Sequence, residues 1–250
     1  MHGNKGVIAI ILKFDALFFA AHPDDIELSC GGIAAKLAKL GKKTCIVDLT
    51  AGELSTRGSV ELRKKEANKA AKVLGITKRI NLAIPDGNIQ NSPENREKII
   101  KIIRQYKPGI IFLPYFNDRH PDHIHASRLV KEAAFYSGLS KIKTSVNNTA
   151  QSPYRPRKNF YYMQTYTFEP VIIVDISDTF KTKMKAIHCY SSQFYNPSSK
   201  EPKTFISDPM FIKHIEARAE FYGFKAGVKY GEPLFTEEKI KISPEDLFNI

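Results

Sequence analysis

A histidine and two aspartates stand together where an apolar run ends near the amino terminus. Ala16–Ala21 reads as a buried strand, and His22-Pro23-Asp24-Asp25 follows it directly. An imidazole and a carboxylate three residues further on can converge on one metal ion, while the proline stiffens the turn between them. A carboxylate beside the metal that does not bind it is a candidate general base. The competing interpretation is that Asp24 or Asp25 only caps the following helix.

A second group of histidines and aspartates follows a later apolar run, Ile110–Leu113. Its members are Asp118, His120, Asp122, His123 and His125. We expect His125 to lie on the surface or beside a ligand residue, and the others to form a chemical site. The competing interpretation is a solvated loop whose aspartates cap the next helix.

Strand-like and helix-like stretches alternate through the first half of the chain. The expected strands are Ala16–Ala21, Thr44–Leu49, Ile80–Ile84 and Ile110–Leu113, and the expected helices are Ile33–Leu40, Leu62–Leu74, Pro93–Tyr106 and Asp122–Tyr136. This alternation predicts an α/β fold, a Rossmann-like and mostly parallel sheet flanked by helices. Ligands of such sheets bind beyond the carboxyl ends of the strands, so the two groups should meet at one edge.

Together the two groups offer imidazole nitrogens and carboxylate oxygens, with no thiolate. Two histidines and one carboxylate around a divalent ion would leave a position open for water. Such a donor set suits catalytic zinc, and other divalent metals are compatible.

The second half of the chain is less regular. Ser140–Lys158 is polar and contains proline, and reads as a long surface loop that is either disordered or lies over a site. The remaining expected elements are strands at Phe160–Met163 and Val171–Ile176, helices at Thr179–Gln193 and Pro209–Tyr222, and a short strand at Lys239–Ile242. We expect a single domain over residues 14–250, with residues 1–13 as an N-terminal extension.

Composition bounds the class of protein without choosing a function. The chain has 250 residues and a net charge of +12, which favours acidic partners in general. Its three cysteines, Cys30, Cys45 and Cys189, are widely spaced and fit a reducing, cytoplasmic location. The apolar run Val7–Leu12 is too short to span a membrane.

A basic α/β module that binds nucleotides or nucleic acid is the rival class. No GxGxxG follows the first strand, and Gly41-Lys42-Lys43-Thr44 precedes a strand rather than a helix. We therefore expect neither a nucleic acid nor a membrane as partner, but a small-molecule substrate.

Several motifs resemble those of the zinc-dependent N-acetylglucosamine deacetylases of the LmbE-like (PIG-L) family. They are His22-Pro23-Asp24-Asp25, Cys30-Gly31-Gly32 and His120-Pro121-Asp122-His123. The chain most resembles the bacillithiol-pathway branch, which acts on N-acetylglucosaminyl malate. The segments that carry this closer resemblance are Asp48-Leu49-Thr50, Glu53-Leu54-Ser55, Glu61-Leu62-Arg63-Lys64, Pro85-Asp86-Gly87, Asp118-Arg119-His120, Ser192-Gln193-Phe194 and Ala217-Arg218.

The resemblance implies a role for each matching residue. The implied zinc ligands are His22, Asp25 and His123. Asp24 would be the general base, and a protonated His120, oriented by Asp122, would stabilise the oxyanion or the leaving group. Arg63 would reach the sugar or its anionic aglycone; the alternative is an arginine on a helix surface.

The resemblance also implies the reaction: removal of acetate from an N-acetylglucosaminyl conjugate, with the malate conjugate favoured. Other glucosamine conjugates and chito-oligosaccharides are the alternatives. It further implies a homo-oligomer such as a hexamer. One position departs from the family: Phe211 stands where a tyrosine is expected near the oxyanion. Either the alignment is shifted there, or Tyr222 or Tyr230 replaces the tyrosine, or His120 and zinc suffice.

Overall fold

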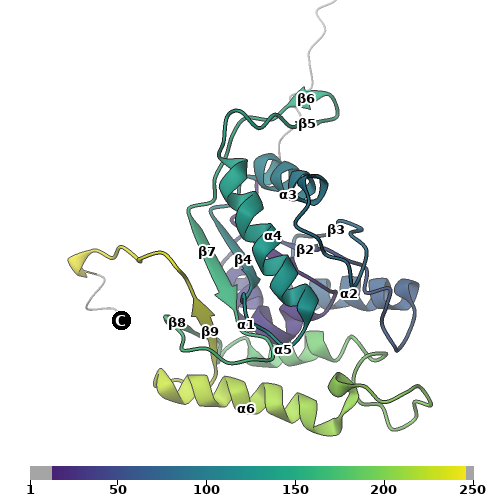
Figure 1. Cartoon of the computed structure of the whole chain (residues 1–250). Helices are drawn as coiled ribbons and strands as arrows, with labels where there is room; N and C mark the ends of the chain where they lie inside the picture. Colours follow the sequence, from purple (N-terminus) through teal and green to yellow (C-terminus); the bar gives the residue numbers. More distant parts are fainter. Residues whose placement is uncertain (1–12, 246–250) are drawn as a thin grey trace, which may run out of the picture.

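The computed structural model describes residues 13–245, and its centre is a seven-stranded sheet (Figure 1). The proposed N-terminal extension lies outside the described residues, except for Lys13. The strands of this sheet are β1 (Ala16–Ala20), β2 (Thr44–Asp48), β3 (Lys78–Asn81), β4 (Ile110–Pro114), β7 (Lys158–Tyr162), β8 (Ile172–Asp175) and β9 (Gly231–Phe235). Their order is β3-β2-β1-β4-β7-β9-β8.

The sheet is parallel except at β9, which runs antiparallel to both β7 and β8. β1 lies between β2 and β4, with Ala16 opposite Thr44 on one side and Ile110 on the other. The chain proceeds outward from β1 through β2 to β3, then returns to the other side of β1 for β4. This reversal creates a crevice at the carboxyl ends of β1 and β4. The α/β, Rossmann-like fold predicted from the sequence is confirmed.

Helices cover both faces of the sheet. They are α1 (Asp25–Lys39), α2 (Val60–Leu74), α3 (Pro93–Tyr106), α4 (Pro121–Ser137), α5 (Phe180–Ile187) and α6 (Pro209–Lys225), with a 3-10 turn η1 at Phe205–Ser207. The core on one face joins strand residues such as Phe19 to Ile103 of α3 and Leu129 of α4. The core on the other face joins Phe18 to side chains of α1, α2, α5 and α6. Among residues 13–245, no helix has both the length and the apolar run that crossing a bilayer requires.

Local sequence signals set the helix ends. The side chains of Ser59 and Ser92 accept hydrogen bonds from backbone N–H groups in the first turns of α2 and α3. Gly75 ends α2 with a φ of 75°, a left-handed conformation that glycine adopts without strain. Pro121 is the first residue of α4, a position where proline favours the start of a helix. His120 and His123 lie on either side of it in the sequence.

Two predicted elements of the second half and one of the first half differ from their observed positions. The strand expected at Lys239–Ile242 is absent, and β9 forms at Gly231–Phe235 instead. The sequence of β9 contains Gly231 and Pro233, which have low strand propensity, and only pairing with β7 and β8 makes it a strand. The helix expected over Thr179–Gln193 ends at Ile187. In the first half, β3 begins at Lys78 and ends at Asn81, earlier than expected.

The segment Ser140–Lys158 is ordered and does not lie over the crevice. It contains a hairpin of β5 (Ser145–Val146) and β6 (Thr149–Ala150), which Figure 1 shows next to α3 and far from α6. The Tyr154 hydroxyl donates to the carbonyl of Pro108, which precedes β4. The segment is therefore attached at the amino ends of the strands, opposite to the edge where ligands bind.

Candidate active site

The two predicted groups of site residues meet at the carboxyl ends of β1 and β4. His22 to Asp25 form the turn from β1 into α1, and His120 and His123 lie at the start of α4. Both groups line a cavity of about 330 Å³. His125 is exposed and does not line this cavity.

The three residues predicted to bind a metal come together around the Asp25 carboxylate. Asp25 Oδ1 lies 3.2 Å from Nε2 of His123, and Oδ2 lies 3.9 Å from Nδ1 of His22. The backbone N–H of His22 also donates to Asp25 Oδ2 at 2.9 Å, which fixes the carboxylate within the turn. Asp25 therefore lies beside both imidazoles, but a joint role of these three residues as ligands stays a prediction.

Further carboxylates hold the two imidazoles in place. His123 Nδ1 lies 2.8 Å from Asp118 Oδ1, which leaves Nε2 directed at Asp25. His22 Nε2 lies 3.0 Å from Asp86 Oδ1 and 3.3 Å from Asp122 Oδ2. Burial alone would lower the pKa of His22, but hydrogen bonds from the ring to Asp122 and Asp86 raise it to about 10.

Two sets of donor atoms, neither of which includes Asp25, lie close enough together to hold a divalent cation. The ring nitrogens of His22, His120 and His123 lie within 4.8 Å of one another, and so do the donor atoms of His22, Asp86 and Asp122. A carboxylate on the rear nitrogen of a histidine, as Asp118 provides, is typical of metal-binding imidazoles. All these donors are nitrogen or oxygen, the chemistry that suits zinc in an open site.

Asp24 lies beside this cluster and does not cap α1. It is the residue before the helix, but its side chain makes no capping hydrogen bond, which argues against the capping interpretation. Its backbone has a φ of 123°, a strained conformation for any residue with a Cβ. Its Oδ2 accepts from Nη2 of Arg63 at 2.8 Å. Burial raises the pKa of Asp24 to about 6, and the Arg63 charge opposes this rise.

Arg63 is buried, so the alternative of a surface arginine does not hold. Its guanidinium also donates to the carbonyl of Pro23 and to the side chains of Ser55 and Gln193. Each nitrogen of the guanidinium therefore has a partner in the protein. Arg63 lines the cavity and contacts Asp24, while a contact with substrate stays a prediction.

His120 and Asp122 meet through the backbone rather than through the Asp122 carboxylate. The N–H of Asp122 donates to Nδ1 of His120 at 3.2 Å, whereas the carboxylate accepts from the N–H of Gly87 and contacts His22. Burial, together with the charges of His22 and His123, lowers the pKa of His120. These contacts favour a neutral His120, which differs from the protonated form that the resemblance implied.

Three site residues received no role from the sequence. Asp86 and Asp118 follow β3 and β4, so their place after parallel strands was a usable signal. Gln164, whose Nε2 lies 3.0 Å from Nε2 of His123, follows β7 in the same way. Phe211 lines the cavity but has no hydroxyl, and Tyr222 does not line the cavity. The Tyr222 hydroxyl instead donates to the carbonyl of Phe168.

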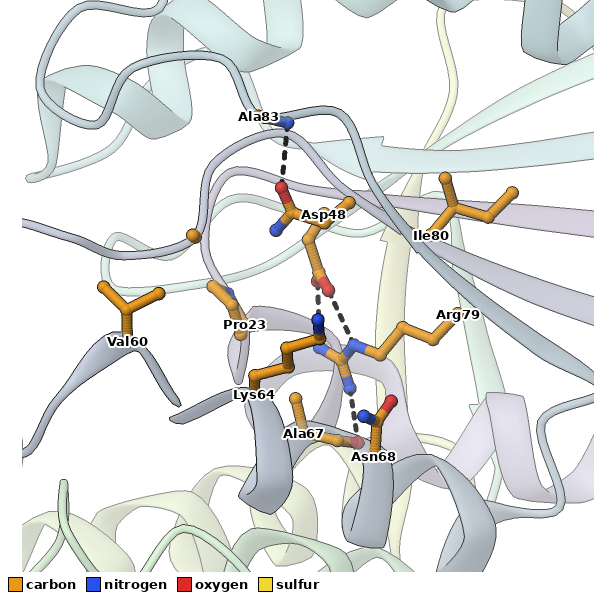
Figure 2. Close-up of a pocket in the computed structure, with 11 residues that line it drawn as sticks. Pro23, Asp48, Val60, Lys64, Ala67, Asn68, Arg79, Ile80 and Ala83 are labelled. Carbon is orange, nitrogen blue, oxygen red and sulfur yellow. Dashed lines mark hydrogen bonds and ion pairs between the residues drawn. The ribbon is translucent and has the colours of Figure 1, made fainter. Parts of the chain in front are cut away.

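A second cavity of about 330 Å³ is lined in part by Pro23, which belongs to the turn from β1 into α1 (Figure 2). Its polar centre is the pair of Asp48 and Arg79, with Arg79 Nε donating at 2.6 Å and Nη2 at 2.9 Å. Arg79 also donates to Glu27 at 2.7 Å. No histidine of the described chain lines this cavity, so it offers no donor set like that at His22 and His123.

Solved structures share this architecture over most of the chain. A conserved protein from Thermus thermophilus has a TM-score of 0.82 and 35% sequence identity, covering 92% of this chain and 98% of that one. The N,N'-diacetylchitobiose deacetylase of Pyrococcus horikoshii has a TM-score of 0.75 and 29% identity, covering 93% of this chain and 85% of that one. The fold and the site together define the class: a hydrolytic N-deacetylase.

The sequence comparisons give the family. Residues 17–134 match the family described as PIG-L, GlcNAc-PI de-N-acetylase. A diacetylchitobiose deacetylase from Thermococcus kodakarensis is 32% identical over 223 residues, which cover 84% of this chain and 78% of that protein. The chain belongs to the PIG-L family of GlcNAc-PI de-N-acetylases.

Proposed function

We propose that the protein hydrolyses the N-acetyl group of an N-acetylglucosamine conjugate and releases acetate and a free amine. The observation that carries this proposal is the buried Asp24 carboxylate, paired with Arg63 at 2.8 Å and adjacent in the chain to the imidazole and carboxylate cluster. Relatives that are named as diacetylchitobiose deacetylases support the choice of an N-acetylglucosamine substrate.

In this proposal His22, Asp25 and His123 hold a divalent ion, with zinc as the favoured metal. Such an ion polarises an amide carbonyl and makes a water molecule beside it more acidic. Asp118 keeps His123 oriented by accepting from its rear nitrogen. Asp86 and Asp122 act in the same way on His22.

Asp24 acts as the general base. It takes a proton as water attacks the acetyl carbon and delivers a proton to the departing nitrogen. A pKa of about 6 leaves the carboxylate mostly ionised at neutral pH, yet more basic than an ordinary aspartate. Arg63 positions the carboxylate and keeps it in the ionised form.

His120 supplies a hydrogen bond to the acyl oxygen. Because its Nδ1 accepts from the backbone N–H of Asp122, the neutral ring carries its proton on Nε2. His120 also lines the cavity, where a donor can stabilise the negative charge that develops on oxygen. A neutral donor of this kind performs the oxyanion role without needing a protonated ring.

Two features support different aglycones. Arg119 is exposed at the cavity, with its guanidinium carbon 4.5 Å from the centre of the Phe205 ring, and this charge favours an anionic group such as malate. The Thermococcus relative, named for diacetylchitobiose, favours a second sugar. We place the malate conjugate and the chitobiose in the same test.

The test measures amine release by the zinc-loaded protein from N-acetylglucosaminyl malate, N,N'-diacetylchitobiose and free N-acetylglucosamine. We expect release from at least one conjugate, and its loss on chelation. Arg119→Gln should reduce turnover of the malate conjugate more than turnover of the chitobiose if the anionic aglycone is correct. Turnover of a phosphodiester, with none of the acetylated sugars consumed, would contradict the proposed function.

A further inference from the structure

A small cavity of about 60 Å³ opens beside His123, next to the catalytic cavity. Both cavities are lined by His123 and Phe211, so the smaller one adjoins the place where an acetamide would be cleaved. Its polar lining includes Ser29 of α1, Gln164 after β7 and Arg218 of α6. The Ala217-Arg218 motif has no role in the proposed reaction so far.

Arg218 brings to this cavity a positive charge that forms no direct ion pair with any residue from 13 to 245. Its guanidinium donates to the backbone carbonyls of Gln164 and Leu28. Glu232 acts on Arg218 through its charge, but the carboxylate forms its ion pair with Lys183, at 2.6 Å. A part-buried guanidinium whose hydrogen bonds go only to neutral acceptors can gain a charge-assisted hydrogen bond from an anion in the cavity.

Two buried side chains of the same cavity have polar atoms without a partner. Ser29 is 4% exposed and Gln164 is 9% exposed, and neither Ser29 Oγ nor Gln164 Oε1 has a hydrogen-bond partner among the described residues. Buried polar atoms normally do have one, so the Ser29 hydroxyl indicates a missing acceptor, whereas Gln164 Oε1 is itself an acceptor and gains nothing from an anion. The N–H group of Gln164 faces Nε2 of His123, and it needs another acceptor whenever a metal occupies that nitrogen.

Size and polarity favour a two-carbon carboxylate. The cavity is about four times as large as the roughly 15 Å³ that one water molecule needs, so it has room for a small ligand. Acetate has four non-hydrogen atoms. Leu28, Phe211 and Ile215 also line the cavity and offer apolar surface to its methyl group.

Building on the proposed function, we propose that this cavity is a product site, in which Arg218, Ser29 and Gln164 bind the acetate released at the catalytic centre. In the hydrolysis, the oxygen of water bonds to the acyl carbon, the carbon–nitrogen bond breaks, and a proton passes to the amine. The acid formed ionises at neutral pH, so the leaving product is an anion that arises next to Arg218.

The experiment titrates the full-length protein with isotopically labelled acetate and follows binding by NMR, before and after removal of metal with a chelator. Ser29 and Arg218 are not among the proposed metal ligands, so we expect acetate binding to persist in the chelated protein, where the Gln164 N–H group faces Nε2 of His123. Arg218→Met should weaken it on the order of 10-fold or more, and Ser29→Ala should weaken it several-fold. Propionate should bind more weakly than acetate, and butyrate should not bind at this site.

Arg104→Met is the matched control. Arg104 is also buried and donates to backbone carbonyls, those of Ser137, Leu139 and Ile142, but it lies in α3 and does not line the cavity. Acetate affinity should be unchanged in this variant. Ser29→Ala removes only one oxygen, so it tests the site even if Arg218→Met does not fold.

Two failures are distinguishable. If the wild-type protein releases no amine from any acetylated sugar but acetate binding still depends on Arg218, the proposed function is wrong and the anion site remains. If amine is released while acetate binds equally to the wild type, Arg218→Met and Ser29→Ala, the product site is wrong. Equal binding of butyrate and acetate would also overturn it.

Discussion

The cavity at Asp24 and the cavity at Asp48 lie on either side of the same turn, and both contain buried carboxylates at strand ends. In the cavity of Figure 2, Arg79 satisfies both oxygens of Asp48. In the catalytic cavity, Asp24, Asp25 and Asp86 share one arginine and two histidines among them. The difference indicates that the paired charges of Asp48 and Arg79 serve folding. The excess of carboxylates in the catalytic cavity leaves room for a cation and a proton acceptor.

Removing a histidine of the cluster should produce the largest change. We expect His22→Ala to lose bound metal and all measurable amine release, because it removes one of the three side chains proposed to hold the ion. Elemental analysis after dialysis measures the metal. His188→Ala is the control, since His188 is exposed at the end of α5. Full metal content in His22→Ala would mean that His22 does not bind the metal and that the buried charges around it serve folding, as those of Asp48 and Arg79 do.

Asp24→Asn should have the next largest effect. The amide fits the same space but cannot accept the proton, so we expect turnover to fall roughly 10²–10⁴-fold while metal content stays at the wild-type level. Parallel assays of amine release and metal content separate the two readouts. Unchanged turnover would remove Asp24 from the chemistry and leave it as a structural residue of the turn.

Substitution of Arg63 and of Arg79 compares the two cavities most directly. We expect its effect on turnover to be smaller than that of Asp24→Asn. Arg63→Met removes the partner of Asp24, and we expect turnover to fall about 10- to 100-fold, the effect of one charge-assisted hydrogen bond. Arg79→Met leaves Asp48 buried and unpaired, so we expect unfolding free energy to drop by about 3–5 kcal/mol. Urea unfolding and steady-state kinetics on both variants measure the contrast.

The double variant Asp48→Leu with Arg79→Met controls for this interpretation. Replacing Asp48 and Arg79 together should recover part of the stability lost in Arg79→Met, because Asp48 is then no longer an unpaired charge, while Glu27 keeps only its hydrogen bond from Tyr190 among the described residues. If Arg79→Met instead folded normally and lost turnover, the cavity of Figure 2 would belong to the catalytic machinery, and the comparison would fail.

Much of the site could be predicted because parallel strands deliver their following residues to one edge. His22 and His123 follow strands that turn out to be neighbours, so their meeting required no knowledge of side-chain packing. The partner of Arg63 could not be predicted, because the contact depends on how α2 packs against the turn at Pro23. The same holds for Arg218, which lies 54 residues from Gln164 in the chain.

The strands could be predicted where the apolar pattern of the sequence was strong. The prediction failed where pairing with neighbouring strands outweighed low strand propensity. β1 and β2 are buried along their whole length, and their apolar runs indicated this directly. β9 contains Gly231 and Pro233, and its strand conformation depends on β7 and β8 on either side. Glu232 in this strand also accepts from the N–H groups of Gly32 and Ile33, a long-range contact that no local pattern reveals.

The backbone of Asp24, at a φ of 123°, has a conformation that glycine adopts freely and that other residues hold at a cost of about 1–3 kcal/mol. Glycine at this position would relieve this strain, but it would delete the proton acceptor and leave the buried Arg63 guanidinium without its ion pair. Selection of variants for heat resistance alone therefore does not preserve activity, so any such screen has to score turnover alongside survival.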